Sequence, residues 1–152
     1  MTTEIETKQQ SLYETDYLRW IETTLAQLQM EDYSNIDWEN LIEEIGDMAR
    51  SERRSLESNL TVIITHLLKW QYQPNFRSGS WKGSIAEHRR RIRKALKESP
   101  SLKSYLEEIL AECYLDAVEI AMAETGLSVE IFPQVCPYQS IEVLDSDFFP
   151  ES

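Results

Sequence analysis

The fold is decided by residues 38–74, which read WENLIEEIGDMARSERRSLESNLTVIITHLLKWQYQP. Apolar side chains recur along this stretch at helical spacing and form one stripe. The stripe consists of Trp38, Leu41, Ile45, Met48, Leu56, Leu60, Ile63, Leu67 and Trp70. Asp37 can cap the helix and Pro74 ends it. At about 1.5 Å per residue the helix would be about 50 Å long, more than a small bundle needs, so we expect a bend or break at Gly46 or within residues 50–54.

A helix is also predicted before this segment. It starts near Ser11, which has capping-box spacing to Glu14, or at Thr15 one turn later, and it extends to about Met30. Its buried face is expected to be largely aromatic. That face comprises Tyr13, Tyr17, Trp20, Ile21, Thr24 and Leu28.

Two more helices are predicted after Pro74. The third helix starts at Ser80, or at Ser84 if the capping box of Ser84 and Glu87 is decisive, and it ends near residue 97. The fourth covers residues 100–125, because Ser99 and Pro100 read as a cap followed by a first-turn proline. Gly126 is its expected C-terminal stop.

Residues 127–152 have a different composition, which mixes prolines with aromatic residues. They suit an extended strap that packs on the helices, with one short helix near residues 141–144. The sequence therefore predicts an all-α fold, an antiparallel four-helix bundle with a C-terminal strap. Residues 1–10 are expected to be a flexible N-terminus, residues 11–126 the bundle and residues 127–152 the strap.

Charge is distributed unevenly along the 152 residues. Residues 50–97 hold twelve of the fifteen Lys and Arg residues but only three of the twenty-seven Asp and Glu residues. The two helices within this window are therefore basic, and the first and fourth helices are acidic. We expect the basic helices to pack beside the acidic ones and to form salt bridges between helices.

Several short motifs resemble one family over most of the chain, from about Tyr13 to Glu151. They include Trp38-Glu39-Asn40-Leu41-Ile42-Glu43-Glu44-Ile45, Ser51-Glu52-Arg53-Arg54, His66-Leu67-Leu68-Lys69-Trp70-Gln71-Tyr72-Gln73-Pro74, Ser99-Pro100-Ser101-Leu102, Glu124-Thr125-Gly126-Leu127 and Cys136-Pro137-Tyr138. Together they resemble the family called Domain of Unknown Function 29. The resemblance implies a small, largely helical protein, abundant in cyanobacteria, with no established activity or ligand. It supplies no catalytic residue.

Five polar residues form a candidate cluster: Glu44, Arg53, His66, His88 and Arg89. Either histidine could be a hydrogen-bonded residue of the core, which we favour. Alternatively, the histidines could act as acid and base with Arg53 or Arg89 in a metal-independent hydrolase or ribonuclease. No arginine stands five to seven residues before either histidine, which counts against the ribonuclease motif.

No metal site is predicted. A di-iron bundle needs Glu-x-x-His pairs, but Ile63 and Ile85 stand three residues before His66 and His88. A carboxylate site remains an alternative that we do not favour, because acids on helix surfaces are usually solvated. Its candidate members are Glu43, Glu44, Glu108, Glu112 and Asp116. We expect no cofactor.

The helix of residues 85–97 carries the densest basic cluster, in which Arg90 and Arg93 are candidate phosphate contacts. Nucleic-acid binding is an alternative that we do not favour, because successive helical residues point in different directions and the net charge of the chain is −12. Trp70, Tyr72 and Trp81 either close the end of the core or form a surface for a partner.

No segment is long and apolar enough to span a membrane, and the two cysteines fit no metal or redox spacing, so a cytoplasmic protein is expected. The long second helix cannot bury its whole stripe within one small bundle. We therefore expect an accessory protein that binds a protein partner or associates with itself, with a homodimer as one form. The sequence does not decide whether the protein is an enzyme, but it favours a protein without catalytic activity.

Overall fold

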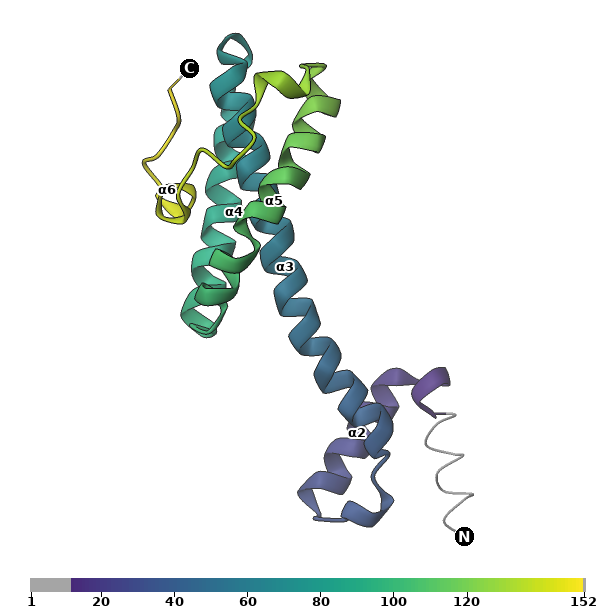
Figure 1. Ribbon diagram of the computed structural model, residues 1–152. Coiled ribbons are helices and arrows are strands. Elements are labelled where there is room, and N and C mark those ends of the chain that lie inside the picture. Colours follow the sequence, from purple (N-terminus) through teal and green to yellow (C-terminus); the bar gives the residue numbers. More distant parts are fainter. Residues whose placement is uncertain (1–11, 152) are drawn as a thin grey trace. The chain divides into compact units, whose positions relative to one another are not determined.

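The computed structural model describes residues 12–151, and every regular element in this range is a helix (Figure 1). The all-α prediction is confirmed. The chain divides after Arg50 into two compact units, whereas the sequence predicts one bundle over residues 11–126. The N-terminal unit comprises residues 12–50 of the described part, and the C-terminal unit comprises residues 51–151. The predicted flexible segment 1–10 and the predicted cap Ser11 lie outside the described residues.

In the N-terminal unit, helix α2 (Tyr17–Gln29) is followed by a short 3-10 helix η1 (Tyr33–Asn35) and by the first turns of α3. Asp16 caps α2, because its Oδ1 accepts the backbone N–H of Arg19 at 3.1 Å. The cap therefore lies one residue after Thr15, the later of the two predicted starts.

Helix α3 (Trp38–Tyr72) begins after Asp37, as predicted. The Oδ1 atom of Asp37 accepts the backbone N–H of Asn40 at 3.4 Å, so Asp37 is the cap. Its Oδ2 atom accepts the indole N–H of Trp20 at 3.3 Å. The Asp37 carboxylate thus caps α3 and also links α2 to α3 through a hydrogen bond.

The predicted break in α3 is wrong, because the helix is continuous through Gly46 and residues 50–54. A glycine inside a helix costs only about 1 kcal/mol relative to alanine, which is too little to end a long helix. Arg50 also stabilises this part of α3, because its guanidinium lies 2.6 Å from the carboxylate of Asp47 and 3.4 Å from that of Glu43 on the same helix.

In the C-terminal unit, the second half of α3 packs with two long helices, α4 (Gly79–Glu98) and α5 (Leu102–Thr125) (Figure 1). The short 3-10 helix η2 (Pro74–Phe76) reverses the chain between α3 and α4. Their shared core is formed by side chains from all three helices. Its helical members include Leu56, Leu60, Ile63, Ile64, Leu67, Leu68, Ile85, Ile92, Leu102, Leu106, Ile109, Cys113, Tyr114, Ala117, Val118 and Ala121.

The boundaries of α4 and α5 differ in part from the predicted ones. Ser78 caps α4 by accepting the backbone N–H of Trp81 at 3.3 Å, so the helix starts earlier than the predicted Ser80 or Ser84. Helix α5 starts at Leu102, two residues later than predicted. It ends at Gly126 as predicted, with a left-handed φ of 74° that glycine adopts without strain.

We name residues 127–151 the C-terminal segment. It contains the short elements η3 (Val129–Ile131) and α6 (Ser140–Leu144), and α6 lies where a short helix was predicted. Three of its side chains, Phe132, Tyr138 and Val143, are buried in the core of the C-terminal unit. The hydroxyl of Tyr138 donates to Gln71 Oε1 on α3 at 2.7 Å. The C-terminal segment therefore packs on the helices as part of the C-terminal unit.

Candidate functional site

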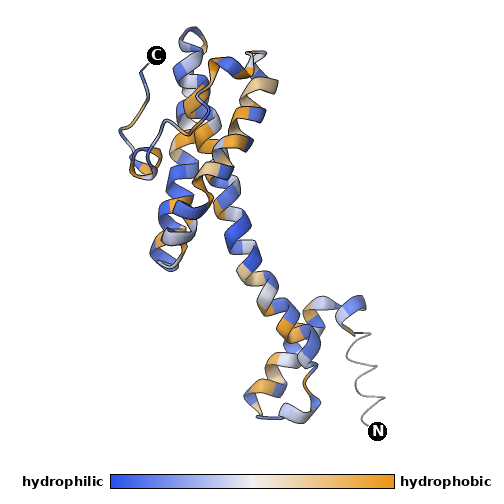
Figure 2. Cartoon of the chain, in the orientation of Figure 1, coloured by the Kyte–Doolittle hydropathy of each residue, from blue (hydrophilic) through white to orange (hydrophobic). Residues whose placement is uncertain are grey.

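The N-terminal unit exposes an unusual amount of apolar surface. Ten large apolar side chains are exposed within residues 12–50, against seven in the much longer range 51–151. The ten are Tyr17, Leu18, Ile21, Leu25, Met30, Tyr33, Trp38, Ile42, Ile45 and Met48. Figure 2 shows the corresponding apolar stretches on α2 and at the start of α3. In the same residues, Trp20 and Ile36 are the buried large apolar side chains.

Helix α2 exposes an apolar face beside its buried one. Trp20 and Thr24 are buried, whereas Leu18, Ile21 and Leu25 are exposed. At about 100° per residue, the three exposed residues lie within about 60° of one another, and their centre is about 110° from that of the buried pair. The exposed residues therefore widen the apolar surface of α2 beyond the part that is buried.

The first turns of α3 carry a second exposed apolar face. It consists of Trp38, Ile42 and Ile45, which are spaced at i, i+4 and i+7 and are 46 %, 67 % and 57 % exposed. We name these three residues the α3 apolar face. Trp38 and Ile45 belong to the stripe predicted from the sequence, whereas Ile42 does not. Farther along the helix, Leu56, Leu60 and Ile63 of that stripe are almost completely buried.

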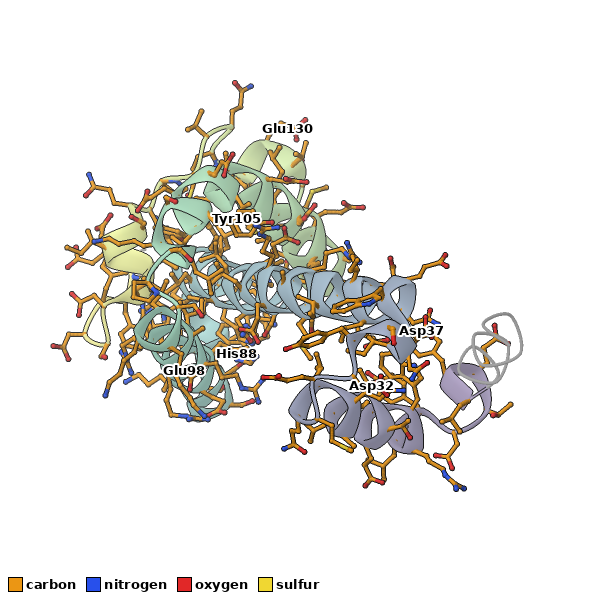
Figure 3. The ribbon with its side chains drawn as sticks, turned by 90° about the horizontal axis from the view of Figure 1, so that it is seen from below. Asp32, Asp37, His88, Glu98, Tyr105 and Glu130 are labelled. Atoms are coloured by element: carbon orange, nitrogen blue, oxygen red, sulfur yellow. The ribbon has the colours of Figure 1, made fainter. Side chains whose placement is uncertain are left out.

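Polar contacts fix the shape of the N-terminal unit. The hydroxyls of Tyr13 and Tyr17 both donate to the carboxylate of Glu44 on α3. The hydrogen bond to Glu44 is the main reason that the pKa of Tyr13 is raised to about 12. Both tyrosine rings also contact Trp20, with ring centroids 4.8 Å and 6.1 Å away. Figure 3 shows Asp32 and Asp37, which lie in this unit just before α3.

The predicted polar cluster is distributed over several environments. Glu44 binds the two tyrosines of the N-terminal unit. In the C-terminal unit, the Arg53 guanidinium lies 5.7 Å from the ring centroid of Tyr105, and the Tyr105 hydroxyl donates to Glu57. Glu44 and Arg53 thus have separate partners within their own units.

His66 on α3 and His88 on α4 are both half-buried, and each makes the same local hydrogen bond. Their Nδ1 atoms lie 2.8 Å from the carbonyl oxygen of Val62 and 2.7 Å from that of Ser84, four residues earlier in each helix. Since a carbonyl only accepts, Nδ1 carries the proton in both rings. Burial is the main cause that lowers the pKa of His66, and the nearby Lys69 and His88 lower it further. Figure 3 labels His88 on α4.

Arg89 is a core residue that holds the C-terminal segment. Its side chain is 1 % exposed, and it donates to the carbonyl oxygens of Val143 at 2.7 Å, Phe148 at 2.9 Å and Glu142 at 3.3 Å. Glu142 and Val143 belong to the last turn of α6, where the carbonyl of Glu142 also accepts the backbone N–H of Asp145 at 3.3 Å. Burial lowers the pKa of Arg89 to about 10, so the guanidinium stays charged at neutral pH.

The basic face of α4 is largely engaged in local contacts. Arg90 and Arg91 both bind Glu87 on the same helix, at 2.9 Å and 3.0 Å, and these two bonds lower the pKa of Glu87 to about 2. Arg93 donates to the hydroxyl of Ser146 at 2.5 Å. The contacts of Arg90, Arg91 and Arg93 therefore differ from the predicted salt bridges to the acidic helices. Lys69 and Glu124 do form an ion pair between α3 and α5, at 2.8 Å.

Trp70, Tyr72 and Trp81, the three aromatic residues predicted to close the core or to face a partner, pack against other groups. The ring of Trp70 lies 4.9 Å from that of Phe149, and Tyr72 contacts Phe132 edge-on at 5.3 Å. The ammonium of Lys69 lies 4.8 Å from the ring centroid of Trp81. The two contacts of Trp70 and Tyr72 with the C-terminal segment close this end of the core.

The surface of the C-terminal unit contains three grooves of a size that suits a small ligand. Two of them have walls formed by α5 and the C-terminal segment. One has a volume of about 550 Å³, and its lining residues include Leu96, Lys103 and Ile141. The other has a volume of about 350 Å³, and its lining residues include Tyr114 and Val135. The third lies between α3 and α5 and has a volume of about 500 Å³. His66 and His88 line none of these three grooves.

Within residues 12–151, no group of three or more His, Cys, Asp and Glu residues is arranged to hold a metal ion. No helix in this range is both long and apolar enough to cross a bilayer.

The model of one protein family, described as Domain of unknown function DUF29, matches residues 12–149. The chain belongs to the DUF29 family. The match covers both units, so the exposed N-terminal unit is part of the DUF29 domain. No curated protein matches the chain, and no solved structure does.

The sequence contains signals for two features of this DUF29 chain that its motifs do not predict. The spacing of Arg89 from Ile85 and Ile92, at i, i+4 and i+7, indicates a core position. The length of the apolar stripe on α3 predicts that part of it stays uncovered or meets a partner, but not which part. The high acid content of residues 12–50 could have indicated the exposed part.

Proposed function

We propose that this DUF29 protein is a protein-interaction module whose N-terminal unit binds a protein partner. One observation carries the proposal, namely the ten large apolar side chains exposed within residues 12–50. Contiguous exposed apolar surface on a folded protein is typical of an interaction site. A cytoplasmic accessory role fits this proposal.

The size of the unit supports the proposal. A domain of about 60 residues buries only about 60 % of the surface that its unfolded chain exposes and is marginally stable by itself. The N-terminal unit is shorter, with 50 residues, and contains neither cysteine, since these are Cys113 and Cys136. A partner that covers α2 and the start of α3 would supply the missing apolar contacts.

The alternatives receive less support from the local contacts. Nucleic-acid binding through α4 would compete with the bonds from Arg90 and Arg91 to Glu87. A hydrolase that uses His66 or His88 needs a cavity beside an imidazole. We therefore retain the interaction module as the working function.

The proposal can be tested with Nile red, an uncharged dye that fluoresces on apolar surface. We expect the double variant Leu18→Ser and Ile42→Ser to lose most of the fluorescence enhancement, because these side chains are 65 % and 67 % exposed. The matched control is the double variant Leu115→Ser and Ile141→Ser in the C-terminal unit, which are 61 % and 72 % exposed. Equal losses in the two double variants would refute the assignment of the interaction surface to the N-terminal unit.

A further inference from the structure

We propose that the α3 apolar face, Trp38, Ile42 and Ile45, binds a basic amphipathic helix of a partner protein. This inference rests on the proposed interaction function and specifies the chemistry of the partner. It follows from the apolar spacing of the face and from the charge around it.

The spacing of the face suits a helix as the ligand. Apolar residues at i, i+4 and i+7 form a ridge along α3 that fits the apolar stripe of a second helix. The indole of Trp38 is held in place because its N–H donates to the carbonyl oxygen of Tyr33 at 3.0 Å. The ridge therefore has a fixed aromatic end and two free aliphatic side chains.

Carboxylates border the ridge. Glu39 and Glu43, one helical turn apart and both exposed, lie on the same side of Trp38 and Ile42 by helical geometry. Residues 12–50 contain ten Asp and Glu residues and two Arg residues, a net charge of −8. Of the two arginines, Arg50 lies 2.6 Å from Asp47 and 3.4 Å from Glu43, so it neutralises only part of this negative charge. A ligand with Lys or Arg beside its apolar stripe complements this surface.

The same charges argue against a second copy of the chain as the ligand. Two N-terminal units, each of residues 1–50, that met through this face would bring a charge of −9 against −9. The basic helix α4 of another copy would supply the opposite charge, but none of the large apolar side chains exposed in the described residues lies on α4. A basic amphipathic helix from another protein satisfies both requirements.

The probe for the test is a fluorescent peptide of about 18 residues, five helical turns, with Leu on one face and Lys on the other. Binding to the full chain is followed by fluorescence anisotropy at about 0.1 M and about 1 M NaCl, between which the Debye length falls from about 10 Å to about 3 Å. A scrambled Leu/Lys peptide and an amphipathic Leu/Glu peptide serve as ligand controls.

We expect the Leu/Lys peptide to bind at the lower salt concentration and the scrambled peptide to bind far more weakly. Ile42→Ser should weaken binding about tenfold, which corresponds to about 1.4 kcal/mol. The double variant Glu39→Gln and Glu43→Gln should weaken it several-fold at the lower salt concentration only. Ile141→Ser, and the double variant Glu108→Gln and Glu112→Gln on α5, should bind like the unmodified chain.

Other outcomes overturn the inference. Equal binding of the scrambled peptide, or no effect of Ile42→Ser, would show that only charge is recognised. If the Leu/Glu peptide binds as tightly as the Leu/Lys peptide, the ligand is not required to be basic. If the chain forms a dimer that Ile42→Ser dissociates, the ligand is a second copy of the chain. Either result is compatible with the proposed interaction function but excludes a basic helix as the specific ligand. If no peptide binds and the chain stays monomeric, the inference fails, and the Nile red comparison then decides the proposed function separately. Ile45→Ser repeats the test if Ile42→Ser loses helicity by circular dichroism.

Discussion

At the scale of single residues, Arg89 shows how a charged side chain can serve as a core residue. Its guanidinium satisfies three backbone carbonyls of the C-terminal segment and lies 5.5 Å from the ring centroid of Phe149. A buried carbonyl that loses its donor costs about 1–3 kcal/mol. Arg89 therefore stabilises the fold through the segment that it holds.

We expect Arg89→Met to lower the free energy of unfolding by about 3 kcal/mol, because it leaves the carbonyls of Val143 and Phe148 without their donor. The measurement is the urea midpoint, with limited proteolysis of residues 127–151 as a second readout. Arg90→Met is the matched control, since Arg90 is exposed and its pairing with Glu87 on the surface is worth at most about 1 kcal/mol. An Arg89→Met protein as stable as the Arg90→Met protein would contradict this role.

At the scale of elements, α3 marks what could be predicted from the sequence. Its apolar stripe, its cap Asp37 and its end before Pro74 all follow from local chemistry, and the structure agrees with them. The predicted break at Gly46 does not occur, because a single glycine is a weak helix breaker and the Arg50 side chain bridges this stretch. Which part of the stripe is buried depends on packing with α4 and α5, and local spacing does not contain that information.

The continuity of α3 at Gly46 predicts the effect of Gly46→Ala. Alanine should stabilise the helix there by about 1 kcal/mol, because a Cβ atom at this position meets first the flexible guanidinium of Arg50, at 3.2 Å. Slower amide hydrogen exchange in residues 42–50 would show the gain. Gly83→Ala on α4 is the control, since a Cβ atom there has no atom within 4 Å and should give a similar gain in residues 80–88. Faster exchange in Gly46→Ala would indicate that α3 is interrupted at this glycine.

At the scale of the whole molecule, the chain combines two units of different character. The C-terminal unit has a core from α3, α4, α5 and the C-terminal segment. The N-terminal unit buries few large apolar side chains and exposes ten. The sequence predicts an excess of exposed apolar side chains, because the stripe of α3 is too long for one small bundle to bury. It does not predict where these exposed side chains lie, because their position depends on how the chain divides after Arg50.

Hydrogen exchange measured by mass spectrometry examines the role of the N-terminal unit most directly. For the chain alone, we expect amides of residues 38–50 to exchange faster than those of residues 56–68, because few buried contacts protect them. Saturation with the Leu/Lys peptide should slow exchange in residues 38–50 at least about tenfold, which corresponds to about 1.4 kcal/mol, and leave residues 56–68 unchanged. If residues 38–50 are already as protected as residues 56–68 in the chain alone and the peptide changes neither, the N-terminal unit is complete by itself and is not an interaction surface.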